Sequence, residues 1–73
     1  MILNVVVWGT GNVGKPAIRA VLSHARLKLV GVIVADPDKD GRDAGELAGL
    51  EQVGVAATRD WQAVLKSKPD VIV

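Results

Sequence analysis

The sequence predicts an α/β fold, a doubly wound parallel sheet of which this chain holds the first half. Two observations predict it. Aliphatic runs alternate with helical patterns along the whole chain, and 49% of the residues are hydrophobic while only 3% are aromatic. Near-continuous Val, Ile and Leu runs are typical of parallel strands that helices cover on both faces. Because crossovers between parallel strands are right-handed, few other topologies fit a chain of 73 residues.

The expected order of elements is β-α-β-α-β-α-β. The predicted strands span residues 4–8, 27–35, 53–57 and 71–73, where aliphatic or β-branched runs are bounded by turn residues. The predicted helices span residues 12–24, 44–48 and 61–68. Pro16 falls in the first turn of its helix, where a missing N–H group costs little. Asp60 is the expected N-cap of the last helix.

The fourth predicted strand begins at Val71 and the sequence ends at Val73. An aliphatic strand is normally completed and its edge covered by other parts of the protein. We therefore expect residues 1–73 to be the N-terminal part of a larger domain, with the chain ending inside its fourth strand. An uncovered edge also favours pairing with another copy, so a homo-oligomer is expected.

Charge and composition argue against several classes of protein. Nine Lys and Arg against eight Asp and Glu give a net charge of +1, without the basic patch that nucleic acids require. The absence of cysteine excludes disulfides and thiolate metal sites. The apolar start is interrupted at Gly9, too early for a signal peptide or a membrane span. We expect a cytoplasmic protein with no membrane, nucleic-acid or metal partner.

A glycine-rich turn lies between the first predicted strand and the first predicted helix, with the pattern G-x-G-x-x-G. Gly9 would permit a tight turn, Gly11 would let a pyrophosphate approach the backbone, and Gly14 would let the helix approach the sheet. Free N–H groups at the start of the helix favour phosphate. The predicted cofactor-binding residues of this loop are Gly9, Thr10, Gly11, Asn12, Val13 and Gly14.

The same loop pattern has three other interpretations. A P-loop is excluded, because Pro16 follows Lys15 where that motif needs Ser or Thr. An S-adenosylmethionine site uses a similar turn, usually without the third glycine. A tight turn with no ligand also stays open.

Asp36 stands at the end of the second predicted strand, 22 residues after Gly14. An acidic residue about 20 residues after the glycine loop accepts hydrogen bonds from the adenosine ribose. Its charge repels a 2′-phosphate and favours NAD, whereas Lys39 and Arg42 could offset that repulsion. NAD is preferred, and NADP or dual use stays open. The alternative is that Asp36 only opens an Asp-Pro turn with Pro37.

Two stretches resemble known enzymes of the Rossmann type. Residues 43–49 read Asp-Ala-Gly-Glu-Leu-Ala-Gly, and a similar stretch follows the second strand of dihydrodipicolinate reductases. Residues 6–14, together with the pattern Lys39-x-Gly41-x-Asp43, more closely resemble the 2,4-diaminopentanoate dehydrogenases and the NAD(P)H-dependent amine dehydrogenases. The resemblance covers essentially all of the chain, but only the cofactor-binding N-terminal part of such an enzyme.

This resemblance implies an oxidoreductase that uses NAD or NADP and transfers a hydride to or from an amine or imine carbon. The glycine loop would hold the pyrophosphate and Asp36 the ribose. Pro37 departs from the acidic-then-basic pair common in the reductases, which leaves the cofactor preference open. The catalytic residues and the substrate site, for an amine or ketone, lie in a second domain of these enzymes. No catalytic residue is therefore expected here, and we expect this chain alone to be inactive.

Other polar residues have simpler structural interpretations. His24, at the end of the first helix, is expected to act as a cation near the helix dipole rather than in catalysis. Asp43 is the expected N-cap of the short second helix, with Glu46 as its capping-box partner.

The two tryptophans and the end of the third predicted strand lie near the predicted cofactor site. Trp8 is expected to fill core space beside the turn, with a place along the cofactor path as the alternative. Trp61 is expected to cover the third helix as a surface lid. Thr58 and Arg59 fall on the carboxyl edge of the sheet, where they would contact the adenosine end of the cofactor. A solvated Arg59 is the alternative.

The sequence is compatible with three functions. The chain is the nucleotide-binding part of an oxidoreductase, or a non-catalytic nucleotide-binding module, or a βαβ scaffold without a ligand. The first is preferred because the glycine loop and Asp36 occur at the spacing that dinucleotide binding requires.

Overall fold

A computed structural model of the chain describes residues 1–9 and 14–73. The strands are β1 (Leu3–Trp8), β2 (Leu27–Ile33), β3 (Ala57–Thr58) and β4 (Val71–Ile72). The helices are α1 (Gly14–Ser23), α2 (Ala44–Leu47) and α3 (Trp61–Lys66), with a 3₁₀ turn, η1 (Pro37–Lys39). The elements alternate along the chain as the sequence predicts.

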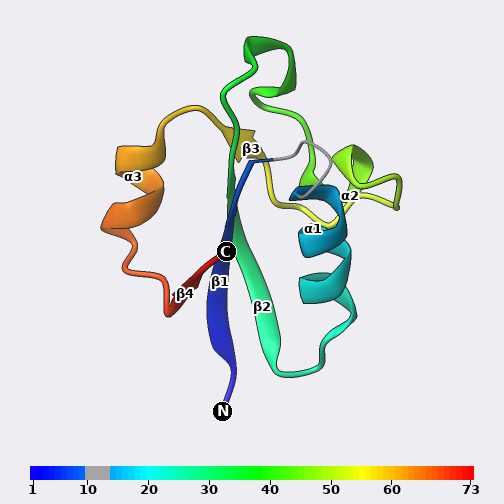
Figure 1. Ribbon diagram of the computed structural model, residues 1–73, viewed down its shortest axis with the longest axis vertical. Helices are drawn as coiled ribbons and strands as arrows, with labels where there is room; N and C mark the ends of the chain where they lie inside the picture. Colours follow the sequence, from blue (N-terminus) through cyan, green and yellow to red (C-terminus); the bar gives the residue numbers. More distant parts are fainter. Residues whose placement is uncertain (10–13) are drawn as a thin grey trace.

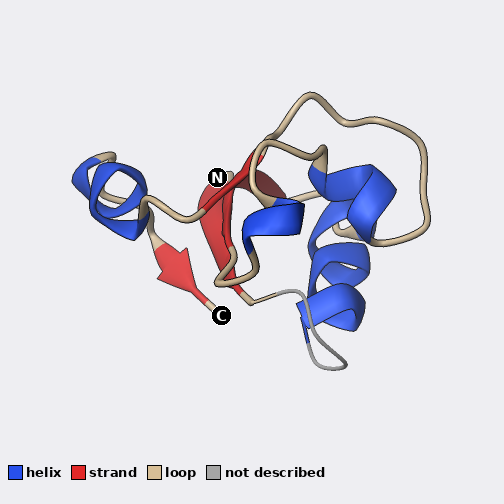
Figure 2. Ribbon diagram, turned by 90° about the horizontal axis from the view of Figure 1, so that it is seen from above, coloured by secondary structure: helices blue, strands red, loops and turns tan. Residues whose placement is uncertain are grey.

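The four strands form one parallel sheet in the order β3-β2-β1-β4. All strands run upward in Figure 1, so their carboxyl ends lie at its top. Seen from above, α1 and α2 lie on one side of the sheet and α3 on the other (Figure 2). The doubly wound, partial Rossmann-type fold is confirmed.

The core is built around β1, the strand between β2 and β4. Val5, Val6 and Val7 are 0–1% exposed. Val5 and Val7 face α1 and pack with Ile18 and Val21. Because side chains alternate along a strand, Val6 points to the opposite face. The sheet is therefore buried on both sides at its centre.

A bulge in β2 aligns its side chains with these two faces. The pairing with β1 shifts by one residue, so that Val5 lies opposite Leu29 and Val6 opposite Gly31. Gly31 then lies under α3, where an added Cβ would come within 2.9 Å of Val64 Cγ1. The missing side chain lets α3 approach the sheet, since a methyl group there would have to displace Val64.

The prediction for the third strand was wrong. We expected residues 53–57, but β3 covers only Ala57–Thr58. The preceding residues bond to the start of α2 instead, because the Ala44 N–H donates to the Val55 carbonyl at 2.7 Å and Asp43 forms an antiparallel bridge with Ala56. β2 also stops at Ile33, before the predicted end at residue 35.

The helices lie close to their predicted positions. Asp60 is the N-cap of α3 as expected, and its carboxylate accepts the Ala63 N–H at 3.1 Å. α3 ends at Lys66, with Ser67 as its C-cap, so the prediction that Lys68 belongs to the last turn was wrong. Lys68 has a φ of 54°, which is left-handed backbone outside the helix.

Asp43 stabilises the segment between β2 and β3 through hydrogen bonds to its carboxylate. Its carboxylate accepts N–H groups of Gly45, Glu46, Val53 and Gly54 at 2.8–3.2 Å. Two of these donors start α2, which confirms the N-cap, and two belong to the loop that follows the helix. The Glu46 side chain makes no reciprocal bond to Asp43 in the described part of the chain, so the predicted capping box is only half formed.

The rest of segment 43–49 joins α2 to α1. The Arg19 side chain donates from Nε to the Ala48 carbonyl at 2.7 Å. Gly49 ends the helix with a φ of 79°, as glycine often does. Gly45 lies against the Glu51 carbonyl, and a Cβ there would overlap that oxygen. Asp43, Gly45, Ala48 and Gly49 therefore have structural roles within residues 43–49, the stretch that resembles dihydrodipicolinate reductases.

Asp43 makes the free energy of unfolding depend on pH in the acidic range. Partial burial alone would raise the pKa of its carboxyl, but the four backbone N–H bonds stabilise the charged form more, and the pKa lies below its ordinary value of 3.8. Because folding lowers this pKa, the stabilisation is complete above the ordinary value, which the unfolded chain keeps. It is lost as the pH falls through the folded pKa.

We expect Asp43→Asn to lower the free energy of unfolding at neutral pH and to flatten its decrease between about pH 5 and pH 2. Urea unfolding followed by circular dichroism across that range measures both effects. The control is Asp38→Asn, since the Asp38 carboxylate accepts no hydrogen bond from the described residues. An equal loss of acid dependence in both variants would contradict this role of Asp43.

Gly45→Ala should destabilise the fold by about 3 kcal/mol, the upper end for an overpacked methyl group, because the obstructing atom is a backbone oxygen. Thermal and urea unfolding measure the loss. Gly41→Ala is a suitable comparison, since Gly41 has a φ of 84° but open space around it. It should lose only the cost of left-handed backbone, about 1–2 kcal/mol. A Gly45→Ala variant as stable as the wild type would show that the loop yields without cost.

Candidate functional site

The candidate site lies at the carboxyl end of the sheet, where β1 leads toward α1. Gly9 follows β1 with a φ of 99°, and its N–H donates to the Ile33 carbonyl at the end of β2. Glycine adopts this backbone without strain. The predicted loop residues Thr10, Gly11, Asn12 and Val13 lie outside the described residues, and Gly14 is the first residue of α1.

The N-terminus of α1 has the electrostatics of an anion site. Its first turn contains no acidic residue and carries Lys15. Unpaired N–H groups and the helix dipole make such a terminus favourable for phosphate. A Cβ at Gly9 would meet no atom within 4 Å, so there is open space on this side of the described backbone.

Asp36 is exposed on the turn that follows β2. Its Oδ1 accepts the Asp38 N–H at 2.9 Å, which makes Asp36 the N-cap of η1. The structural alternative from the sequence, an Asp-Pro turn, is therefore present. It occupies one carboxylate oxygen, and a carboxylate has two. Capping the turn and binding a ribose are thus compatible roles.

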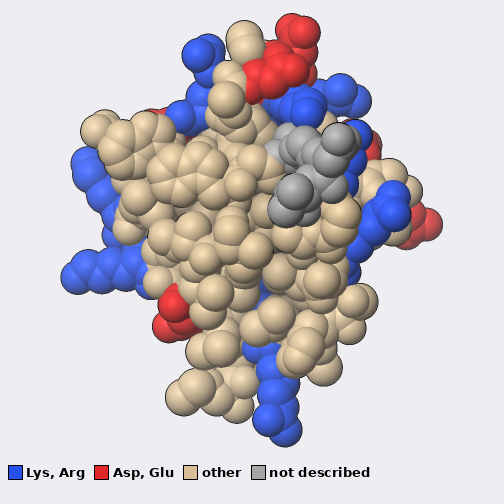
Figure 3. Space-filling model, viewed as in Figure 1, with Lys and Arg blue, Asp and Glu red and all other residues tan. Residues whose placement is uncertain are grey.

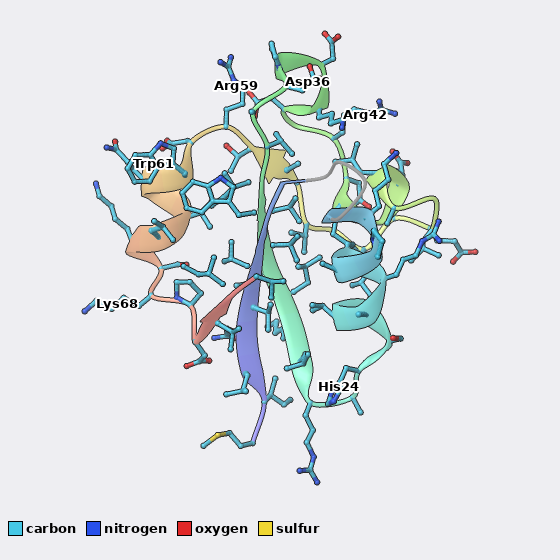
Figure 4. The ribbon with its side chains drawn as sticks, in the orientation of Figure 1. His24, Asp36, Arg42, Arg59, Trp61 and Lys68 are labelled. Atoms are coloured by element: carbon cyan, nitrogen blue, oxygen red, sulfur yellow. The ribbon has the colours of Figure 1, made fainter. Side chains whose placement is uncertain are left out.

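Basic residues share this end of the molecule with Asp36. Figure 4 shows Arg42 and Arg59 in its upper part together with Asp36, and Lys39 ends η1. Figure 3 shows acidic side chains at the top of the molecule with Lys and Arg beside them, whereas the centre of that face is uncharged. The end of the sheet thus combines one carboxylate suited to a ribose with cations suited to a phosphate.

Hydrogen bonds tie the turn after β2 to the loop after β3. The Arg59 N–H donates to Asp40 Oδ1 at 3.2 Å, and the Gly41 N–H donates to the Ala57 carbonyl at 2.8 Å. Thr58 is half-buried at the end of β3 and accepts the Asp60 N–H on its hydroxyl. The predicted carboxyl-edge residues Thr58 and Arg59 are therefore held close to the turn that carries Asp36.

The two tryptophans contact each other, which no pattern in the sequence predicts. The rings of Trp8 and Trp61 stack with centroids 6.0 Å apart and an angle of 27° between their planes. Trp8 is 49% exposed, so the prediction that it fills the core was wrong. It follows Val7, which faces α1, and alternation turns it to the α3 side. Trp61 is 45% exposed and lies over Trp8.

His24 lies at the opposite end of the molecule from Asp36 (Figure 4). Its Nδ1 accepts the Arg26 N–H at 3.1 Å in the turn between α1 and β2. This contact lies just after α1, and the expected role of His24 near the helix dipole stays a prediction.

A shallow hollow of about 410 Å³ lies beside α2, lined by Gly41, Arg42, Asp43, Glu46, Gln52, Gly54 and Ala56. The Asp43 carboxylate in its wall accepts hydrogen bonds from backbone N–H groups.

In residues 1–9 and 14–73, no three His, Cys, Asp or Glu side chains are grouped to hold a metal ion. No helix in these two ranges is long and apolar enough to cross a membrane.

Comparison with known proteins gives consistent results. The family model of the dihydrodipicolinate reductase N-terminus matches residues 3–73. An amine dehydrogenase of Streptomyces virginiae is 56% identical over 72 residues, which cover 97% of this chain and 20% of that protein. A 4-hydroxy-tetrahydrodipicolinate reductase of Synechococcus elongatus is 36% identical over 61 residues, or 84% of this chain and 22% of that protein.

The solved structure of an amine dehydrogenase from Mycobacterium smegmatis superposes with a TM-score of 0.83 at 35% identity, covering 96% of this chain and 21% of that one. The chain thus spans about a fifth of the length of these relatives. The resemblance to dihydrodipicolinate reductases and to amine dehydrogenases is confirmed. The match over residues 3–73 shows that the chain belongs to the family of dihydrodipicolinate reductase N-terminal domains, the pyridine-nucleotide-binding domains of dehydrogenases and reductases.

Proposed function

We propose that this domain binds the ADP half of NAD or NADP for an oxidoreductase that transfers a hydride to or from an amine or imine carbon. One observation carries the proposal. β1 is followed by Gly9, whose backbone is left-handed, and the next described element is the N-terminus of α1. Similarity to amine dehydrogenases and to 4-hydroxy-tetrahydrodipicolinate reductases supports the reaction class.

In this proposal the glycine loop, residues 9–14, holds the pyrophosphate with backbone N–H groups. Asp36 accepts hydrogen bonds from the adenosine ribose with the oxygen that does not cap η1. The bound nicotinamide would supply the hydride chemistry. The role of this chain is to bind and orient the cofactor, and the catalytic residues belong to another part of the protein.

NAD is the proposed preference. The Asp36 carboxylate would repel a 2′-phosphate and bind two ribose hydroxyls in its place. Arg42 and Arg59 lie at the same end of the molecule (Figure 4) and would partly compensate for that repulsion, which supports NADP as a second cofactor.

We also propose that the protein is cytoplasmic and a homo-oligomer that uses a small amine or ketone substrate. A non-catalytic nucleotide-binding module is the alternative function, and an assay for amine-dependent reduction of NAD by the protein distinguishes the two.

Gly11→Val should weaken ADP-ribose binding at least tenfold, because a branched side chain would stand where the pyrophosphate approaches the backbone. Isothermal titration calorimetry of the protein with ADP-ribose measures the loss. Ala63→Val, at an exposed position on α3, is the control and should bind as the wild type does. Equal affinities of wild type and Gly11→Val would show that the glycine loop is only a turn.

Asp36→Asn should shift the preference toward NADPH. The amide oxygen can still accept the Asp38 N–H, so the turn is kept while the charge that repels a 2′-phosphate is removed. We expect NADH affinity to fall about tenfold and NADPH affinity to rise, as is typical when a hydrogen bond to a charged group is lost. Asp38→Asn is the control for the change in net charge. An unchanged ratio of NADH to NADPH affinity in Asp36→Asn would exclude the ribose role.

A further inference from the structure

Trp8 and Trp61 form an exposed aromatic surface at the carboxyl end of the sheet, here called the tryptophan pair. Each ring packs on the other while about half of its surface stays in water. They are the only tryptophans of the chain, which has no Phe or Tyr. Neighbouring aromatic side chains that stay half in water point to binding rather than to core packing.

The tryptophan pair is connected to both parts of the proposed cofactor site, the glycine loop and the turn that carries Asp36. Trp8 directly precedes Gly9, where the glycine loop begins. The Trp61 N–H donates to the Arg59 carbonyl at 3.0 Å, and the Arg59 N–H donates to the Asp40 carboxylate. Two hydrogen bonds therefore connect Trp61 to the turn that follows Asp36. Figure 4 shows Trp61, Arg59 and Asp36 all in the upper part of the molecule.

We propose that the outer face of the tryptophan pair is the surface on which the adenine ring of the dinucleotide stacks. This inference rests on the proposed function. Indole and adenine both present flat π-faces, and stacking of a base on an aromatic side chain is favourable for any base. The adenine is favoured over the nicotinamide because it is attached to the ribose that Asp36 would bind.

The geometry of the pair decides where the ring lies. Carbon atoms in contact are about 3.5 Å apart, so a base inserted between two rings needs centroids about 7 Å apart. The centroids of Trp8 and Trp61 are 6.0 Å apart. The pair is too close to hold a base between its rings, and the adenine therefore stacks on its outside.

Because Trp8 and Trp61 are the only tryptophans in residues 1–73, intrinsic fluorescence of this chain reports on the surface directly. We expect ADP-ribose to quench the emission and nicotinamide mononucleotide to leave it unchanged. Trp61→Leu should weaken ADP-ribose binding at least about fivefold, as loss of one base–aromatic stack does. Trp61→Phe, which keeps an aromatic face, should recover most of the affinity. Leu50→Ala is the control, an exposed apolar residue next to α2.

The outcomes separate this inference from the proposed function. If ADP-ribose binds wild type and Trp61→Leu equally, the stacking surface is wrong while cofactor binding stands. If nicotinamide mononucleotide quenches the emission instead, the tryptophan pair serves the other ring and the inference is overturned. If ADP-ribose binds neither the wild type nor any variant, both proposals fail. Trp8→Leu provides a second test if circular dichroism shows Trp61→Leu to be unfolded.

Discussion

The structure depends on burying both faces of β1. Three consecutive valines of this strand are almost completely excluded from water, so each face needs its own helical cover. α1 supplies one cover with Ile18 and Val21, and α3 supplies the other across Gly31. The bulge in β2 keeps Leu29 and Val32 on the α1 side. One apolar strand thereby determines which face every neighbouring side chain occupies, including that of Trp8.

The carboxyl end of the sheet is ordered by a different means. The segment from Asp36 to Asp43 contains little regular structure, yet three of its aspartates accept backbone N–H groups. Asp36 caps η1, Asp40 holds the loop after β3, and Asp43 joins α2 to the loop that follows it. Short carboxylate side chains can replace the backbone acceptors that a helix or strand would supply. The loops that carry the candidate site are therefore held in place without belonging to a strand or a long helix.

The sequence predicts those parts of the fold that depend on contacts between residues close together in the chain. β1 and β2 were predicted well because aliphatic runs identify buried strands locally. The Asp60 and Asp43 caps were predicted because their signals lie within three residues of the helices. β3 was misplaced because residues 53 and 54 bond to Asp43, ten and eleven positions earlier, and no local pattern shows that contact. The tryptophan pair was missed for the same reason, since its rings belong to β1 and α3.

The groups at the carboxyl end also bear on the proposed role of this domain in cofactor binding. Asp36 and Asp40 each accept a backbone N–H group, and Arg42 and Arg59 carry guanidinium groups that stay protonated in proteins. Neither kind of group is suited to exchanging protons with a substrate near neutral pH. The single histidine of the chain, the residue type best suited to that task, lies at the other end of the sheet. The described part of this edge offers charged groups, a left-handed glycine and an aromatic surface, which fits the proposed role of holding a dinucleotide.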